Sequence, residues 1–218
     1  MLKIKKIFFD FKTELKKDKK SFMWLVYFVI YAMTTFEIFN RPLIGPVGSL
    51  KTAIDDKIPF IKEFILPYDT FMPMIVIVGL LLFAYDKKNY KKFMVTLFFA
   101  QTASYLIVLF FQTEVPRYDT SLLGNDIFSN MIKITYTLDN NYSGAPSMHV
   151  ANMVISSIFF AKLDFNRTSK ILVIAYMLFV ALTTVFVKQH VFLDMPAGII
   201  HAFFSYYVVQ YYLKRKEV

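Results

Sequence analysis

The sequence has no cysteine among its 218 residues, so disulfides, thiolate metal sites and cysteine nucleophiles are excluded. Charged residues are also scarce, at 19%, and only three residues are histidine. The chain is instead 56% hydrophobic and 18% aromatic, with a mean hydropathy of +0.47. This composition excludes a disordered chain, a fibrous repeat and a disulfide-stapled secreted scaffold, and it predicts an integral membrane protein.

Six apolar stretches are candidates to cross a membrane, whose hydrocarbon core of roughly 30 Å takes about 20 residues of helix. The sequence therefore predicts an all-α fold, a six-span transmembrane helical bundle made by a single domain, residues 1–218. The predicted spans are 22–39, 70–85, 93–112, 147–162, 171–187 and 191–213, of which the second and fourth are short.

Positive charge is unevenly distributed among the segments that join these spans. Eighteen of the 25 lysine and arginine residues fall in the two tails and in the second–third and fourth–fifth connections, against seven on the other side. By the positive-inside rule the crowded side is cytoplasmic, so both termini, including the basic tail 1–21, are predicted to lie in the cytoplasm of a multi-pass cell-membrane protein. The net charge of +9 then reflects topology, and no nucleic-acid partner is predicted.

Two long segments, 40–69 and 113–146, fall on the predicted outer face. Both carry apolar residues at helical spacing, although Pro59 interrupts the first. We predict short interfacial helices there, and ordinary loops packed on the bundle are an equal alternative.

The segment Lys188-Gln-His-Val-Phe-Leu-Asp194 contains two groups with complementary chemistry. His190 and Asp194 are four residues apart, which predicts that they share one helix face at the outer mouth of the sixth span. A carboxylate in that position can accept the imidazole Nδ1–H and leave Nε2 free as a nucleophile. A structural ion pair or a pair of metal ligands is the alternative.

A second segment, Gly144-Ala-Pro-Ser-Met-His149, precedes the predicted fourth span. Pro146 fits the first position of a helix, and Ser147 would then fall in its first turn. The free N–H groups of that turn, together with the Ser147 hydroxyl, can bind an anion. His149 projects from the same turn, where a capping or interfacial histidine is the alternative.

Arg117 lies just past the outer end of the predicted third span. A guanidinium there can hold a phosphate in a bidentate manner, although an interfacial arginine is also a common headgroup anchor. All three segments fall on the predicted outer face, and together they offer a cation, a helix N-terminus and two histidines. This combination suits phosphoryl transfer.

The order Arg117, then Pro146-Ser147-x-His149, then His190-x3-Asp194 resembles the type 2 phosphatidic acid phosphatase superfamily, the lipid phosphate phosphatases that share their site with vanadium haloperoxidases. The resemblance covers the six-span topology and roughly residues 109–200. The family's first motif is Lys-x6-Arg-Pro, its second Pro-Ser-Gly-His and its third Ser-Arg-x5-His-x3-Asp.

The sequence departs from these motifs at five positions. Phe110 stands in place of the lysine, Tyr118 of the proline, Met148 of the glycine, and Thr183 and Thr184 of the Ser-Arg pair. Two phosphate-binding cations are therefore missing. Lys188, four residues after Thr184 and on nearly the same helical stripe, is predicted to supply part of that charge, with an interfacial anchor as the alternative.

The resemblance implies a mechanism. His190 would attack phosphorus to form a phosphohistidine, and Asp194 would stabilise the imidazolium. His149 would protonate the leaving lipid alkoxide. The non-bridging oxygens would be held by Arg117, Ser147, Lys188 and the backbone N–H groups near Met148. The resemblance implies no metal and no cofactor, because protein cations neutralise the phosphate.

The predicted function is therefore hydrolysis of a lipid phosphate monoester or diphosphate at the outer leaflet, with that lipid and the surrounding membrane lipids as partners. Candidate substrates are phosphatidic acid, phosphatidylglycerol phosphate and an isoprenyl (di)phosphate. A phosphotransferase that moves a headgroup between lipids is one alternative, because a relaxed third motif resembles that of sphingolipid headgroup transferases. A small transporter or scaffold is another. His201, about 16 Å deeper than His190, is predicted to be an interior histidine bonded to a neighbouring span, and the oligomeric state is left open.

Overall fold

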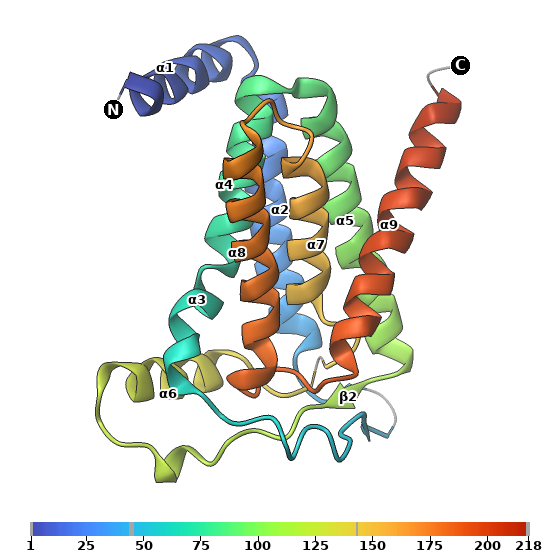
Figure 1. The fold of residues 1–218 in the computed structure, drawn as a ribbon. Helices are drawn as coiled ribbons and strands as arrows, with labels where there is room; N and C mark the ends of the chain where they lie inside the picture. Colours follow the sequence, from blue (N-terminus) through green and yellow to red (C-terminus); the bar gives the residue numbers. More distant parts are fainter. Residues whose placement is uncertain (1, 44–45, 143, 217–218) are drawn as a thin grey trace.

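The computed structural model describes residues 2–43, 46–142 and 144–216, with backbone only at 2–9 and 216. The chain is mostly helical (Figure 1). The α-helices are α1 (Leu2–Lys17), α2 (Lys19–Phe39), α3 (Ile65–Asp69), α4 (Phe71–Tyr85), α5 (Lys87–Phe110), α6 (Ile127–Leu138), α7 (Met148–Phe160), α8 (Arg167–Phe186) and α9 (Asp194–Lys216). Two short 3₁₀ helices, η1 (Lys62–Phe64) and η2 (Thr120–Leu122), complete the helical elements of the described residues.

Four helical segments are long and apolar enough to cross a membrane: Lys19–Phe39, Lys62–Tyr85, Lys87–Phe110 and Arg167–Phe186. The second of these joins η1, α3 and α4 into one continuous run. α7 is apolar but has only 13 residues, or about 20 Å of helix, and α9 is longer but richer in polar side chains. The membrane character is therefore supported, and the count of six spans remains a prediction.

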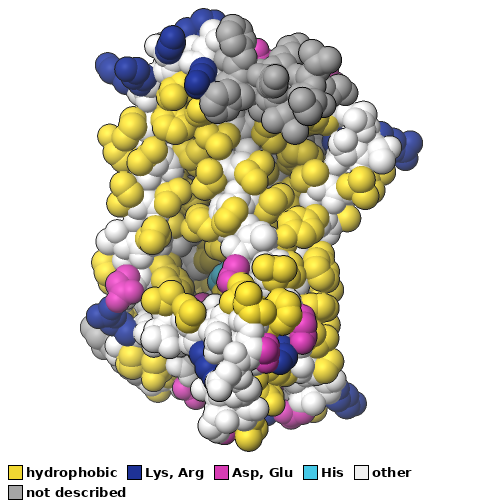
Figure 2. All heavy atoms as spheres, turned by 90° about the vertical axis from the view of Figure 1, so that its left-hand side faces the viewer, with side chains coloured by type: hydrophobic (Ala, Val, Ile, Leu, Met, Phe, Trp, Pro, Cys, Tyr) yellow, Lys and Arg dark blue, Asp and Glu magenta, His cyan; other side chains and the backbone are white. Residues whose placement is uncertain are grey.

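α7 lies at the centre of the bundle, where it packs against α4, α5, α8 and α9. Most of its side chains are buried, and the main hydrophobic core forms around it. The outer surface of the bundle is also apolar. Figure 2 shows hydrophobic side chains across the middle of one face, with charged side chains gathered toward the two ends. This arrangement fits a surface that contacts lipid.

Both ends of the chain lie at one end of the bundle, and α3, α6 and β2 lie at the other (Figure 1). β1 (Gly48–Ser49) and β2 (Thr113–Glu114) form a two-residue parallel pair there, with Gly48 opposite Thr113, so the fold is not purely α-helical. Which end faces the cytoplasm remains a prediction that rests on the charge distribution.

The two long connections differ from each other. Segment 113–146 contains α6, which begins where the Asp126 carboxylate accepts hydrogen bonds from the N–H groups of Phe128 and Ser129. In the described part of segment 40–69, residues 40–43 and 46–69, helix begins only at residue 62, so the chain around Ile54 and Ile58 follows the loop alternative and not the predicted helix. Instead, Asp55 accepts hydrogen bonds from the N–H and hydroxyl of Thr52 and closes a local turn.

Candidate active site

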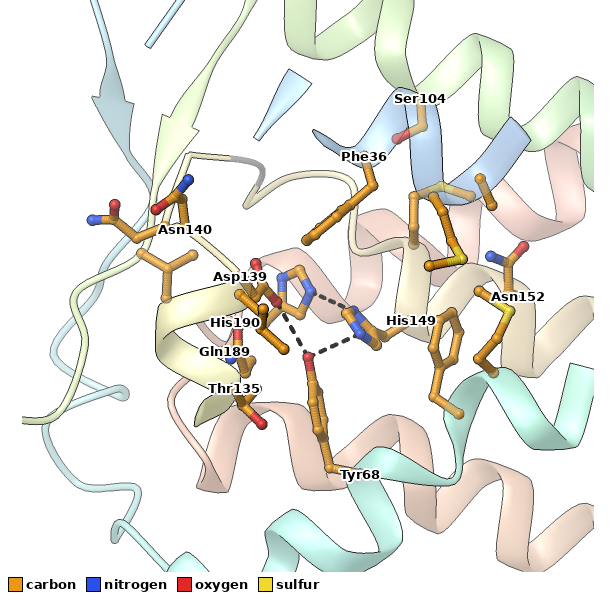
Figure 3. Close-up of a pocket in the computed structure, with 18 of the residues that line it drawn as sticks. Phe36, Tyr68, Ser104, Thr135, Asp139, Asn140, His149, Asn152, Gln189 and His190 are labelled. Atoms are coloured by element: carbon orange, nitrogen blue, oxygen red, sulfur yellow. Dashed lines mark hydrogen bonds between the residues drawn. The ribbon is translucent and has the colours of Figure 1, made fainter. Parts of the chain in front are cut away.

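The three segments singled out in the sequence meet at one end of the bundle. His190 lies in the connection between α8 and α9, His149 in the first turn of α7, and Arg117 shortly after β2. Arg117, His149 and His190 all line one cavity, and residues of α2, α4 and α5 form other parts of its wall (Figure 3).

The His190–Asp194 pair forms, but not as a pair on one helix face. α8 ends at Phe186 and α9 begins at Asp194, so His190 lies in the turn that precedes α9. His190 Nδ1 is 3.0 Å from Asp194 Oδ2, which also accepts the backbone N–H of Val191 at 3.1 Å. Asp194 is fully buried, and its Oδ1 has no hydrogen-bond partner among the described residues.

His149 connects His190 to a tyrosine that the sequence did not single out. His149 Nδ1 is 3.2 Å from His190 Nε2, and His149 Nε2 is 3.0 Å from the hydroxyl of Tyr68 (Figure 3). The Tyr68 hydroxyl also lies 3.4 Å from Asp139 Oδ2, but its single proton serves only one of these two acceptors at a time. Five side chains are therefore linked by polar contacts from Asp194 to Asp139.

The proton positions in this chain follow from Asp194. A carboxylate only accepts hydrogen bonds, so His190 carries its proton on Nδ1 and leaves Nε2 as an acceptor. His149 must then donate from Nδ1 to His190 Nε2, which leaves its own Nε2 to accept from the Tyr68 hydroxyl. In this arrangement the lone pair on His190 Nε2 points at His149.

Ser147 caps α7 rather than lying in its first turn. The helix begins at Met148, and the Ser147 hydroxyl accepts the N–H of Val150 at 3.3 Å, so the prediction that Pro146 occupies the first helical position is wrong. The backbone N–H of Ser147 donates to the carbonyl of Asp194 at 3.3 Å. The start of α7 is thereby tied directly to the start of α9.

Gly198 allows α9 to approach α7 this closely. A Cβ at position 198 would lie 2.6 Å from the Ser147 carbonyl oxygen and 2.9 Å from the Cβ of Val150. Any larger residue would therefore push α9 away from α7. The contact places Asp194, four residues earlier on α9, beside the first turn of α7, and so brings His190 to His149.

Arg117 is largely buried and bonded to protein oxygens. Its guanidinium donates to the carbonyls of Lys188, Asp139 and Asn140 and lies 3.5 Å from the Asp139 carboxylate, while its Nε has no partner among the described residues. Burial raises the pKa of Asp139, and the nearby Arg117 guanidinium opposes that rise. Asn40 donates to Asp139 as well, at 2.7 Å.

Lys188 does not extend a helical stripe from Thr184, because α8 ends at Phe186 and Lys188 has a left-handed backbone with φ of 52°. Its ammonium donates to the carbonyls of Asp55 and Ile58, at 3.1 and 2.6 Å. Burial lowers the pKa of Lys188, and the Asp55 carboxylate opposes this. The Thr184 carbonyl accepts the backbone N–H of His190 at 3.2 Å and so anchors the turn.

Asp55 fastens the 50s segment to the histidine-bearing turn. Its Oδ1 accepts the backbone N–H of Phe192 at 2.6 Å, and its Oδ2 accepts two hydrogen bonds from Thr52. Burial acts to raise the pKa of Asp55, but these hydrogen bonds outweigh burial and hold the pKa below its ordinary value of 3.8.

Two cavities adjoin His190. The larger has a volume of about 410 Å³ and a mostly apolar lining. It is bounded by α2, α4, α5, α7 and the end of α6. Figure 2 shows a histidine at the bottom of a hollow in the apolar face of the bundle. The smaller, of about 170 Å³, is a charged recess. Its walls are formed by Lys51, Asp55, Asp56, Pro116, Arg117, Tyr118, Lys188, His190 and Val191.

The remaining histidine lies away from this site. His201 on α9 is buried, and its Nε2 donates to the backbone carbonyl of Ala100 on α5 at 2.8 Å. The prediction of an interior histidine bonded to a neighbouring helix is confirmed. Among the described residues, no group of three or more His, Cys, Asp and Glu side chains is placed to hold a metal ion.

The family comparison agrees with this geometry. The sequence model of the PAP2 superfamily matches residues 43–208. The chain belongs to the PAP2 superfamily. It has no match among curated proteins or among solved structures. Membership of the PAP2 superfamily, together with the apolar helices, fits a membrane protein of the phosphatase type.

The PAP2 match includes every segment that carries the resemblance, and the structure shows what replaces the missing motif residues. Phe110 is 73% exposed on the outside of the bundle and brings no charge to the site. Thr183 and Thr184 donate their hydroxyls to carbonyls of their own helix. The site therefore has fewer cations than the full PAP2 motifs would place there.

Tyr68 and Asp139 are the site residues that sequence reasoning missed. They lie in the two long connections, 81 and 10 residues before His149, and neither belongs to a motif. The only signal in the sequence was that both connections were predicted on the same face as the motifs.

Proposed function

We propose that the chain is an integral membrane lipid phosphatase, which hydrolyses a lipid phosphate monoester or diphosphate at the outer leaflet through a phosphohistidine intermediate. The observation that carries this proposal is the hydrogen-bonded chain Asp194–His190–His149, in which His190 Nε2 faces His149 at the wall of an apolar cavity. A lipid tail fits such a cavity, and a nucleophile oriented by a buried carboxylate fits covalent catalysis.

In the first step, the lone pair on His190 Nε2 attacks phosphorus and the bond from phosphorus to the lipid oxygen breaks. His149, which takes up a second proton when the phosphate enters between the two rings, gives its Nδ1 proton to that oxygen, so a neutral lipid alcohol leaves and His149 becomes a neutral imidazole. Asp194 stabilises the positive charge that the phosphorylated His190 ring acquires. In the second step, water gives one proton to His149 as its oxygen attacks phosphorus, the bond from phosphorus to His190 Nε2 breaks, and phosphate is released.

The two histidines must separate before a substrate can bind in this way. Attack requires about 3–3.5 Å from nitrogen to phosphorus, and the leaving oxygen needs a hydrogen bond of about 2.7–3.2 Å to His149. The two ring nitrogens must therefore lie at least about 6 Å apart, compared with 3.2 Å in this structure. Tyr68 contacts His149 at Nε2, the ring nitrogen that faces away from His190. If this hydrogen bond is kept while the rings separate, Tyr68 limits the directions in which His149 can move.

Charge on the phosphate would be met by Arg117, Ser147, Lys188 and the N–H groups at Met148. Arg117 and Lys188 both point toward carbonyls, so each would exchange one carbonyl bond for a phosphate oxygen. That exchange replaces a neutral acceptor with an anionic one and is therefore favourable.

The phosphatase and the phosphotransferase differ only in the second step, where an alcohol of another lipid replaces water. Purified protein would be incubated with ³²P-labelled phosphatidic acid, with and without added diacylglycerol or ceramide. Free phosphate released without an added alcohol supports the phosphatase, whereas label that appears only in a second lipid supports the transferase.

The nucleophile is tested in the same assay with His190→Ala. We expect this variant to lose turnover and acid-labile ³²P labelling while keeping its melting temperature, and vanadate to inhibit the wild-type protein. Lys170→Ala, on the first turn of α8 at the opposite end of the bundle, is the matched control. Near-normal turnover in His190→Ala would show that another residue attacks phosphorus.

The proposed orientation can be tested because the chain has no native cysteine. A single cysteine placed at Glu114, near the site, should react with a membrane-impermeant maleimide in intact cells. A cysteine at Lys170 should react only after the cells are broken. The reverse pattern would place the site on the cytoplasmic side.

A further inference from the structure

Gln189 lies beside the proposed nucleophile and has no role in the proposed mechanism. It lines the larger cavity together with His190, and only 3% of the residue is exposed. Figure 3 shows Gln189 on the same part of the cavity wall as His190 and Thr135 of α6. The backbone N–H of Gln189 donates to the Thr184 carbonyl at 2.9 Å, so the residue is held in the turn that carries His190.

The amide nitrogen of Gln189 is a buried donor without an acceptor. Its Nε2 has no hydrogen-bond partner among the described residues, and the same is true of Nε of Arg117 on the wall of the same cavity. A buried polar atom left unpaired carries a desolvation cost that a hydrogen bond would remove. Two unpaired donors on one wall therefore indicate an acceptor that enters the cavity from outside the chain.

A phosphoryl group is the acceptor that fits these donors. Gln189 is the chain neighbour of His190, and the proposed reaction brings anionic phosphate oxygens to His190. Hydrogen bonds to such oxygens are roughly twice as strong as bonds between neutral groups. Among the described residues, the other buried atom without a partner on this wall is Asn152 Oδ1. That atom is itself an acceptor and cannot bond an ionised phosphate oxygen.

A neutral donor also suits the charge of this site. Phe110 and Thr184 bring no cation, and the guanidinium of Arg117 already lies 3.5 Å from the Asp139 carboxylate. An amide can bond a phosphate oxygen without the cost of burying another charge. Gln189 would therefore restore a hydrogen bond, although not the charge, that the missing motif residues would supply.

We propose that Gln189 is a further phosphate-binding residue, whose Nε2 donates to a non-bridging oxygen of the phosphoryl group at His190. This inference rests on the proposed function for the presence of that group. It applies to the phosphoryl group of the lipid ester and to the phosphate ion released from it, because both present anionic oxygens to the amide.

Orthovanadate and inorganic phosphate probe this site without a lipid. The purified protein in detergent would be melted over a range of concentrations of each anion, and the rise in Tm gives the affinity. KM and kcat for ³²P-labelled phosphatidic acid are measured on the same preparations, which extends the test from the free anion to the lipid ester. The first variant is Gln189→Met, which keeps the length of the side chain and removes the donor.

We expect Gln189→Met to bind vanadate and phosphate about 10- to 100-fold more weakly and to lower kcat/KM for the lipid by a similar factor. Its Tm without anion should stay the same or rise, because an apolar group replaces a buried unpaired donor. Gln189→Glu keeps the shape but places a carboxylate beside the phosphate. At a pH well above the ordinary pKa of glutamate, it should weaken anion binding further.

Gln210→Met is the matched control. Gln210 lies on α9, and its Nε2 is also buried without a partner in the described part of the chain, but Gln210 lines neither cavity beside His190. We expect this variant to resemble Gln189→Met in its Tm without anion and to keep the wild-type anion affinity and turnover.

Failure of this inference and failure of the proposed function give different results. Wild-type affinity for both anions in Gln189→Met, or an equal loss of affinity in Gln210→Met, would overturn the role of Gln189 and leave the phosphatase intact. Anion binding that only the Gln189 variants lose, without turnover of any lipid phosphate by the wild-type protein, would support the role of Gln189 and overturn the phosphatase.

Discussion

Replacing Asp194 with asparagine is the most direct test of how His190 is activated. Asp194→Asn concerns the chemical step itself. The asparagine can keep an oxygen in the position of Oδ2 and still accept from His190 Nδ1 and from the Val191 N–H. What it removes is the negative charge that faces the His190 ring when that ring becomes positive during attack.

The size of this effect follows from the distance between the two groups. Opposite unit charges 3.0 Å apart attract by about 5.5 kcal/mol at an effective dielectric constant of about 20. At about 1.36 kcal/mol per tenfold change in rate, complete loss of this attraction slows the reaction about 10⁴-fold. Because the asparagine oxygen retains a partial dipole, we expect kcat to fall by about 10³- to 10⁴-fold.

The assay is single-turnover formation of the ³²P-labelled protein from labelled lipid phosphate, which isolates the first step. Asp119→Asn is the matched control, because Asp119 is an exposed carboxylate that caps η2 away from the cavity. We expect that control to change the rate by less than twofold. An Asp194→Asn protein that is folded and retains more than a tenth of the wild-type rate would refute the charge argument.

Three further predictions concern the surroundings of the histidine pair. Tyr68→Phe removes the hydroxyl that donates to His149, so we expect kcat to fall by about 10- to 100-fold and the kcat–pH profile to shift; an unchanged profile would limit Tyr68 to packing. Lys188→Ala should raise KM more than Lys170→Ala does, and equal KM values would remove Lys188 from phosphate binding. Asp55 has a pKa below its ordinary 3.8, so the stability from its hydrogen bonds is complete above pH 3.8 and is lost as pH falls through the lowered folded-state pKa. We therefore expect Asp55→Asn to melt lower than wild type at neutral pH and to lose less stability on acidification, as measured by Tm against pH; parallel curves would contradict this.

The helices were largely predictable because apolar runs and capping residues are local signals. Asp86 and Asn166, which begin α5 and α8 by accepting N–H groups of the first turn, stand directly before those helices in the sequence. The end of α8 was less predictable. Apolar residues continue past Phe186, but Lys188 adopts a left-handed backbone, and periodicity carries no information about that change.

The motif residues were predictable as a set, but their geometry was not. A His-x3-Asp spacing fits a helix and a tight turn equally well, and the turn seen here depends on distant contacts, among them the approach of α9 to α7 at Gly198 and the bond from Phe192 N–H to Asp55. The Tyr68–His149 contact joins residues 81 positions apart, so no local pattern could reveal it. The turn around Asp55 replaced an expected helix because side-chain hydrogen bonds to its own backbone outweighed apolar spacing.

His190 forms part of the wall of both cavities, and this has a consequence for traffic through the site. The His190 ring adjoins the mostly apolar 410 Å³ cavity, which suits hydrocarbon chains. It also adjoins the smaller recess, which is lined by lysine, arginine and aspartate side chains. Apolar and charged reactants could therefore reach and leave His190 through different cavities. In the proposed reaction, the lipid product would return to the bilayer through the apolar cavity. The phosphate ion would leave through the charged recess without entering the hydrocarbon region.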